Sequence, residues 1–160
     1  MAENTLNIEL ESSDKTAEFA VKLASKLSAG DTVLLSGDVG AGKSFFARAM
    51  ITSLLTQPED IPSPTFTLVQ TYDTEIGALW HADLYRLSSD FEVEELGLLD
   101  AMSDAVCVIE WPDRLGEFMP KNALNINLSA GKTDESRRMS ISWSDIRWQT
   151  AMIDWERHVL

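Results

Sequence analysis

The alternation of apolar and polar residues along the chain predicts several strands. Apolar side chains occupy every second position in the segments 6–10, 124–128 and 139–143, as expected of strands with one buried face. The runs 32–35 and 105–109 are almost wholly apolar, and the second is typical of a central strand buried on both faces. The first segment is expected to be an edge strand, and the last two to pair as antiparallel neighbours.

Helical spacing of apolar residues marks three longer segments. We expect one helix from the N-cap candidates at 12–14 to about Leu27, a second over about 45–55, and a third over about 145–158. One stripe of the third helix is expected to be core or a packing surface, and it carries Trp148, Met152, Trp155 and Val159.

The middle of the chain predicts a hairpin followed by short helices. Strand-like segments at 65–72 and 78–84 flank a turn, and residues 90–96 are compatible with a helix. Together the elements predict a single α/β domain over residues 1–160. We expect a mostly parallel central sheet, extended by antiparallel strands, with helices on both faces.

A phosphate-binding loop follows the 32–35 strand and precedes the second helix, which is the context its pattern requires. Glycines let the backbone turn its N–H groups inward, and the start of a helix favours bound anions. In this pattern the lysine reaches the β- and γ-phosphates and the hydroxyl residue ligates Mg²⁺. The loop residues are Gly37, Asp38, Val39, Gly40, Ala41, Gly42, Lys43 and Ser44.

Two carboxylates follow or end predicted strands and are candidates for chemistry on a bound nucleotide. Asp83 lies near the end of the second predicted strand of the hairpin, 78–84. Glu110 directly follows the most apolar predicted strand, 105–109. Either acid can hold a Mg²⁺-bound water or polarise an attacking water, and the residues alone leave that choice open. Thr65, in the proline-rich segment 63–66, is a candidate sensor of the γ-phosphate. His81 is interpreted as structural, because metal-ligand partners at suitable spacing are absent from the sequence.

Charge and composition limit both the classes of partner that the protein can bind and the compartment in which we expect it. The net charge of −13 argues against unaided binding to nucleic acid, which requires basic patches. It is compatible with basic protein partners, but an acidic surface that only serves solubility is the favoured interpretation. Cys107 is the single cysteine, so an internal disulfide is excluded and a buried thiol in a reducing compartment is expected. The first residues lack the pattern of a signal peptide, and no apolar run approaches bilayer-spanning length. We therefore expect a cytoplasmic protein without a membrane segment.

Four motifs in order resemble the TsaE (YjeE) family, the small bacterial ATPase of tRNA threonylcarbamoyladenosine biosynthesis. They are the phosphate loop 37–44, the segment 63–69 with Tyr72, the segment 81–87 and the segment 109–114. The resemblance covers about residues 6–143, and the tail after Trp143 carries no family motif.

This resemblance implies a function and a set of roles. Family members bind ATP or ADP with Mg²⁺, hydrolyse ATP slowly, and act with the TsaD–TsaB pair, which modifies the adenosine beside the tRNA anticodon. By resemblance, contact with tRNA is expected only through these partners. By this resemblance, Ser44 and Glu110 are expected to hold Mg²⁺, and Asp83 is expected to support the hydrolysis of ATP. The nucleotide contacts carried over are Lys43 with the loop backbone, Thr65, Trp111, and the weaker match at Ser13 and Thr16.

The alternative function is a small-molecule or nucleoside kinase, which shares the loop and the length. A kinase needs an arginine-rich lid over the transferred phosphoryl group. Two consecutive arginines occur only once in the sequence, at Arg137 and Arg138. We expect them in a short polar turn between strands rather than in a lid, and this disfavours a kinase. A GTPase is the third and least favoured alternative. The sequence contains no Asn-Lys-x-Asp stretch, which is the segment that recognises guanine in GTPases.

Overall fold

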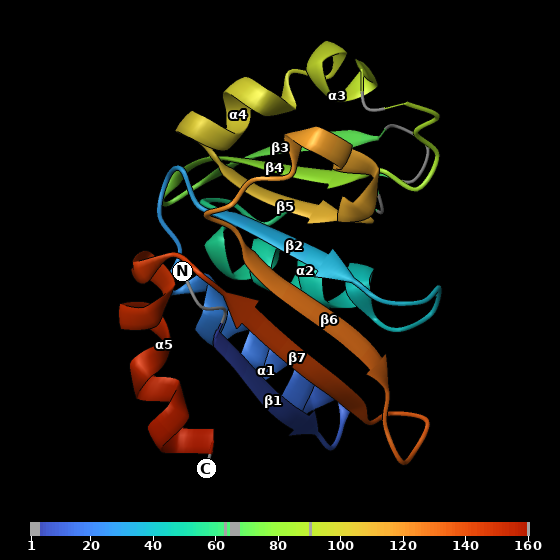
Figure 1. Cartoon of the computed structure of the whole chain (residues 1–160). Helices are drawn as coiled ribbons and strands as arrows, with labels where there is room; N and C mark the ends of the chain where they lie inside the picture. The colour runs from blue at the N-terminus through green and yellow to red at the C-terminus, as the bar shows by residue number, and fades with distance from the viewer. Residues whose placement is uncertain (1–3, 63, 65–67, 90, 160) are drawn as a thin grey trace.

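The computed structural model describes residues 4–62, 64, 68–89 and 91–159, with side chains as far as 152. The strands within these residues are β1 Asn4–Leu10, β2 Thr32–Ser36, β3 Val69–Thr74, β4 Gly77–Asp83, β5 Val106–Glu110, β6 Leu124–Ala130 and β7 Arg137–Trp143. They form one sheet in the order β1-β7-β6-β2-β5-β4-β3 (Figure 1).

The centre of the sheet is parallel and both of its ends are antiparallel. β2 pairs in parallel with β5 and β6, and β5 pairs in parallel with β4. The hairpin partner β3 runs against β4, while β7 runs against both β6 and β1. The predicted fold class is confirmed, as are the hairpin, the edge position of β1 and the antiparallel pairing of the last two strands.

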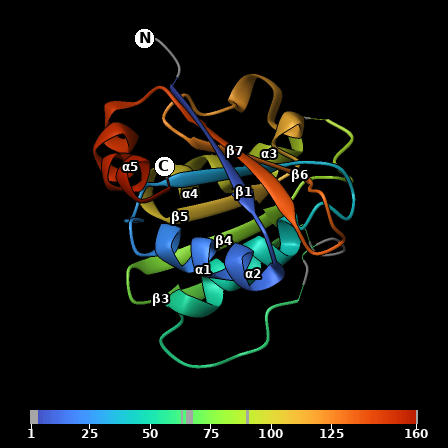
Figure 2. The ribbon, with the colours of Figure 1, turned by 90° about the horizontal axis from the view of Figure 1, so that it is seen from below.

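Helices cover the two faces of the sheet. On one face lie α1 Ser13–Ala24 and α2 Lys43–Leu54, and on the other lie α3 Phe91–Glu95, α4 Leu98–Asp104 and the 3₁₀ helix η1 Pro112–Phe118 (Figures 1 and 2). The alternation of side chains along a strand explains the two cores, because β2 sends Val33 and Leu35 to the first and Leu34 to the second.

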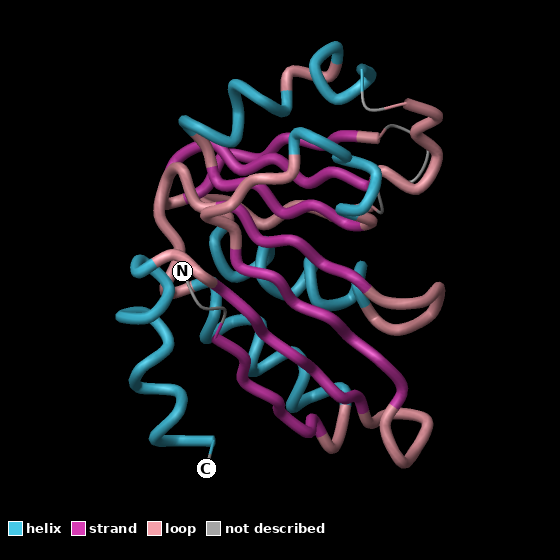
Figure 3. Tube along the Cα trace, viewed as in Figure 1, coloured by secondary structure: helices cyan, strands magenta, loops and turns pink. Residues whose placement is uncertain are grey.

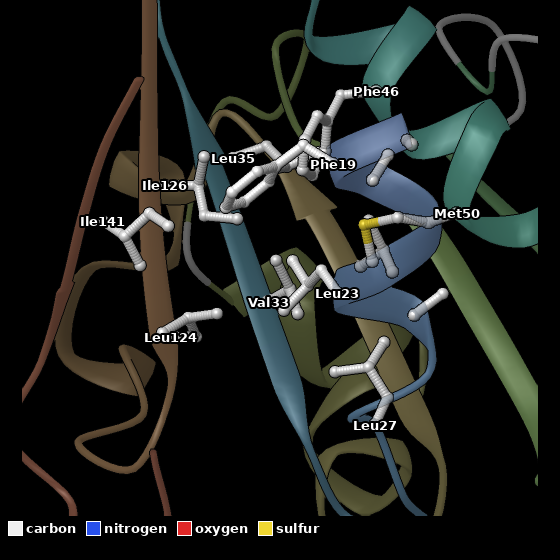
Figure 4. Close-up of a cluster of buried hydrophobic side chains, with 14 of the residues drawn as sticks. Phe19, Leu23, Leu27, Val33, Leu35, Phe46, Met50, Leu124, Ile126 and Ile141 are labelled. Atoms are coloured by element: carbon white, nitrogen blue, oxygen red, sulfur yellow. The ribbon is translucent and has the colours of Figure 1, made fainter. Parts of the chain in front are cut away.

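The first core joins α1 and α2 to the parallel strands. Figure 4 shows Phe19 and Leu23 of α1 beside Met50 of α2, all facing side chains of β2 and β6. Leu23 and Met50 expose none of their surface, so each contributes about 1.5–3 kcal/mol of transfer free energy. This packing holds the start of α2, and hence the phosphate loop before it, against the end of β2.

The last helix, α5 Ile146–Val159, packs beside the sheet near the start of β6 (Figure 1). Trp148 and Met152 are fully buried, and the Trp148 indole donates to the Asn122 carbonyl at 2.8 Å. The prediction of a packing stripe is confirmed for these two residues, whereas the side chains of Trp155 and Val159 lie outside the described ones. Among the described residues, no helix combines the length and apolarity needed to cross a bilayer.

Three predicted boundaries are wrong. α1 ends at Ala24 rather than near Leu27, because the chain tightens into turns with the bond from the Leu27 N–H to the Ala24 carbonyl. β3 begins at Val69, since Leu68 has a left-handed φ of 66° that interrupts an extended strand. Arg137 belongs to β7 rather than to a polar turn, because its backbone pairs with both neighbouring strands.

Candidate phosphate-binding site

The parallel register brings three strand ends together at one edge of the sheet. Leu35 of β2 lies opposite Glu110 of β5, and Glu110 lies opposite Asp83 of β4. The segments that follow these strands, two loops and the helix η1, lie along the same side of the molecule in Figure 3. The carboxyl edge of a parallel sheet is where α/β proteins place their ligands, because loops from several strands converge there.

The phosphate loop leaves β2 in a conformation that depends on its glycines. Gly37 has φ 141°, and a Cβ added there would lie 2.3 Å from the Leu128 carbonyl oxygen of β6. Gly42, at φ 102°, is the residue before α2. Only glycine adopts such angles without strain, so the loop can wrap tightly and present the amino end of α2 to an anion.

Lys43 is the first residue of α2, and only 5% of its surface is exposed. Its Nζ donates to the carbonyl oxygens of Gly37 at 2.6 Å and Asp38 at 2.9 Å, and lies 4.3 Å from the centre of the Trp111 ring. Burial lowers the pKa of the Lys43 ammonium below its ordinary value, while the nearby carboxylates, Glu110 foremost, act in the opposite direction. Backbone carbonyls and the aromatic face therefore stabilise the charged form of this buried ammonium.

A buried hydrogen-bonded chain links the loop to two strands. Ser44 Oγ donates to Glu110 Oε1 at 2.9 Å, and Glu110 Oε2 lies 2.7 Å from His81 Nε2. The Glu110 and His81 side chains expose 2% and 0% of their surface. Because a carboxylate only accepts hydrogen bonds, Nε2 carries the proton and donates it to Glu110. His81, interpreted from sequence as structural, thus directly contacts a predicted site residue.

Asp83 occupies the neighbouring strand end, and 5% of its surface is exposed. Its Oδ1 accepts from the Tyr85 backbone N–H at 3.0 Å. Tyr85 also contacts Trp111, with ring centroids 4.8 Å apart. Trp111 itself has φ 57°, an uncommon angle for a bulky residue that is often found at functional sites. Its backbone N–H is held by the Leu35 carbonyl, which fixes the ring beside Lys43.

These groups line a cavity of about 370 Å³, within the usual range of small-molecule sites. Its predicted lining residues are Val39, Gly40, Gly42, Lys43, Ser44, Asp83, Glu110 and Trp111, and Phe45 and Tyr85 join them. The side chains that bring oxygens to this cavity are Ser44, Tyr85, Asp83 and Glu110. The serine hydroxyl and the two carboxylates are ligands that suit Mg²⁺. The described residues contain no group of three or more His, Cys, Asp or Glu placed to hold a metal alone.

A second cavity of about 230 Å³ shares Gly42 and Phe45 with the first. Ser13 and Thr16, the weaker predicted contacts, lie in its wall with Arg137. Thr65 falls outside the described residues. Sequence reasoning missed the contact of Arg137 with the loop and that of His81 with Glu110. Nothing local signals either one, because each joins residues distant along the chain.

The chain is similar to known proteins along most of its length. The family described as "Threonylcarbamoyl adenosine biosynthesis protein TsaE" matches residues 10–139. The tRNA threonylcarbamoyladenosine biosynthesis protein TsaE of Rickettsia bellii is 39% identical over 130 residues, which cover 81% of this chain and 89% of that protein. The Haemophilus influenzae protein of the same name is 35% identical over 115 residues, 71% of each chain. The crystal structure of Bacillus subtilis YdiB shares the fold, with a TM-score of 0.78 at 24% identity over 99% of this chain and 98% of that one.

Proposed function

Since the chain belongs to the TsaE family, whose members act in tRNA threonylcarbamoyladenosine biosynthesis, we propose that it binds and slowly hydrolyses Mg²⁺-ATP to support that modification. The observation that carries the proposal is the 2.9 Å bond from Ser44 Oγ to Glu110 Oε1. It joins the hydroxyl of a phosphate loop to a carboxylate 66 residues away, at the end of an adjacent parallel strand. Nucleotide-hydrolysing proteins with this loop hold Mg²⁺ with such a pair.

The loop and the start of α2 bind the phosphates in this proposal. The backbone N–H groups of the loop and the first turn of α2 face the β-phosphate, and Lys43 reaches the β- and γ-phosphates. Lys43 already lies in the cavity wall, with its charge held between carbonyls and the Trp111 ring. Leaving those carbonyls for phosphate oxygens replaces neutral acceptors with charged ones, which make the stronger hydrogen bonds.

Ser44 and Glu110 would hold the metal, and Asp83 would serve the attacking water. Mg²⁺ bound with ATP neutralises the charge that develops on the transferred phosphoryl group. The His81 N–H fixes one oxygen of Glu110, so the other stays directed at Ser44. Asp83 also lines the cavity from the adjacent strand, where its carboxylate can accept a proton of water and orient the oxygen for attack.

Partner proteins complete the proposed role. We infer that the chain acts with a TsaD–TsaB-type complex in the cytoplasm, because the modification of tRNA by this family is expected to require that pair. The net charge of −13 supports contact with tRNA only through these partners, since a polyanion repels an acidic surface.

The kinase alternative has weaker support. Its lid would need arginines above the transferred phosphoryl group. Arg138 instead pairs with Glu9 on the surface at 3.1 Å, and Arg137 Nε donates to the Ala41 carbonyl of the loop. Neither residue lines the 370 Å³ cavity that holds Lys43 and Asp83.

Labelled ATP distinguishes the two functions. The protein is incubated with ATP labelled on the γ-phosphate, alone and with the TsaD–TsaB pair, and the label is followed. Release as free phosphate that rises with the partners supports the proposal, whereas transfer to a metabolite contradicts it.

Site variants test the placement of the roles. Lys43→Ala is expected to weaken ATP binding roughly 10- to 100-fold, because charge-assisted hydrogen bonds contribute about 1.5–3 kcal/mol. Glu110→Ala is expected to retain much of the binding and lose turnover. Lys22→Ala, on the exposed face of α1, is the matched control and should behave as wild type. Near-normal turnover in both site variants would mean that the site is elsewhere.

A further inference from the structure

Arg137 connects the β6–β7 hairpin to the phosphate loop. Its backbone is fixed between two strands, opposite Leu10 of β1 and Ala130 of β6. From this position the side chain reaches across the fold, and Nε donates to the Ala41 carbonyl oxygen at 3.0 Å, a contact between residues 96 positions apart. A side chain anchored in the sheet therefore holds one peptide group of the loop.

The guanidinium is itself immobilised by the turn that follows β6. Nη1 donates to the carbonyl oxygens of Asp134 at 2.8 Å and Ser136 at 2.7 Å. The turn is closely packed, because a Cβ on Gly131 would lie 2.3 Å from Ser136 Oγ. A planar guanidinium bound to three carbonyl groups has little freedom left, so its Nε–H direction is set before any ligand arrives.

The contact determines the orientation of the next N–H in the loop. The peptide bond between Ala41 and Gly42 is trans, so its C=O and N–H point in opposite directions. With the Ala41 oxygen directed at Arg137, the Gly42 N–H is directed away from Arg137. Gly42 lines the cavity together with Lys43 and Ser44, and it has no side chain to restrain its own backbone. A Cβ added to Gly42 would stand 3.6 Å from Arg137 Nε, so the guanidinium lies beside this residue of the loop.

We propose that Arg137 is a positioning residue that orients the Gly42 N–H toward the phosphate of the nucleotide, an inference that rests on the proposed function. An N–H aimed in advance at a charged oxygen needs no reorganisation on binding, so the affinity of the loop for phosphate rises. The positive charge of Arg137 near the loop acts in the same direction.

Two other roles for Arg137 make different predictions. If Arg137 only stabilised the β6–β7 hairpin, its replacement would lower the stability of the fold and leave the affinity of the folded protein for phosphate unchanged. As a contact to the nucleoside in the 230 Å³ cavity, which it also lines, it would affect ADP and not pyrophosphate. Magnesium pyrophosphate is therefore the informative probe, because it occupies the loop and lacks a nucleoside.

The test measures binding of magnesium pyrophosphate and of ADP by calorimetry to wild type, Arg137→Ala, Arg137→Lys and Arg138→Ala. Arg138 is the matched control: it is the adjacent residue on β7, and its surface ion pair with Glu9 leaves it 58% exposed. Arg137→Ala is expected to weaken both ligands by the same factor, about 10-fold, as for one lost hydrogen bond in the complex. Arg137→Lys keeps one donor and should recover part of the loss, and Arg138→Ala should match wild type.

Hydrolysis kinetics provide a second readout that a purely structural role would not produce. KM for ATP should rise in Arg137→Ala in proportion to the loss of affinity, with kcat within about twofold of wild type, because binding is equally weakened in the ground and transition states. Unchanged pyrophosphate affinity in Arg137→Ala and Arg137→Lys would overturn the inference, as would a loss confined to ADP. If Arg137→Ala fails to fold, Arg137→Lys decides the matter. Failure of wild type to bind either ligand would instead reject the proposed function.

Discussion

The buried pair of His81 and Glu110 allows a quantitative prediction. We consider replacing His81 with leucine, which has a similar volume and no donor. Glu110 Oε2 then loses the N–H that lies 2.7 Å away, in a position where only 2% of the side chain is exposed and water does not replace it. Ser44 Oγ still donates to the other oxygen. His81 Nδ1 has no hydrogen-bond partner among the described residues, so the bond through Nε2 accounts for the polar role of the ring.

The expected loss follows from the burial and charge of this bond. Hydrogen bonds to charged groups contribute about 1.5–3 kcal/mol net, and a buried carboxylate left without its partner is at the upper end. For a chain of this length, that loss lowers Tm by roughly 3–12 °C. His81→Gln keeps an amide N–H at about the distance of Nε2 and should lose less than half as much.

A double-mutant cycle with Glu110→Gln isolates the pair. Urea unfolding of wild type, the two single variants and the double variant gives the coupling free energy, which we expect to be about 1.5–3 kcal/mol. A coupling below about 0.5 kcal/mol, within the additivity of independent sites, would refute the reasoning that His81 supports the carboxylate.

Two further predictions concern the loop and the core. Gly37→Ala should lower the free energy of unfolding by more than the roughly 1–3 kcal/mol of a strained φ, because the added Cβ would lie 2.3 Å from the Leu128 oxygen. Gly40→Ala, where φ is 83° and nothing lies within 4 Å, is the control in urea unfolding, and equal losses would contradict the clash. Burial raises the pKa of the Cys107 thiol to about 12, so the native protein should not react with a thiol reagent at pH 8, and the unfolded chain should. The thiol contributes stability below about pH 9 that is lost as pH rises toward 12, which a pH series of unfolding curves would detect.

The sequence by itself determined the features that depend on neighbouring residues. The loop 37–44 could be recognised from the sequence because its glycines, lysine and serine lie within eight consecutive positions. In the structure those glycines have positive φ angles, which glycine adopts more easily than any other residue. Periodicity likewise marked β1, β6 and β7, because side chains alternate between faces wherever a strand lies. The full burial of β5 confirms the reading of an apolar run as a strand covered on both faces.

Boundaries were less accurate, because caps and left-handed residues end an element without changing its hydrophobic pattern. The helix α1 stops at Ala24 although Leu27 continues the apolar spacing and remains buried. Leu68 has a favourable residue type for a strand and a φ of 66° that excludes it. Both outcomes depend on contacts of the backbone, which composition does not report.

Only the tertiary structure decided which chemistry-bearing side chains meet. The pattern of a strand shows which face is buried, but its neighbour in the sheet depends on pairing between distant segments. The parallel register sets Asp83 beside Glu110 and both beside the loop, and it places His81 within reach of Glu110. The bond of Arg137 to the loop joins residues 96 positions apart, and it exists because β7 and β6 carry the hairpin to that edge. Such contacts depend on the packing of the whole sheet, because no local segment contains both partners.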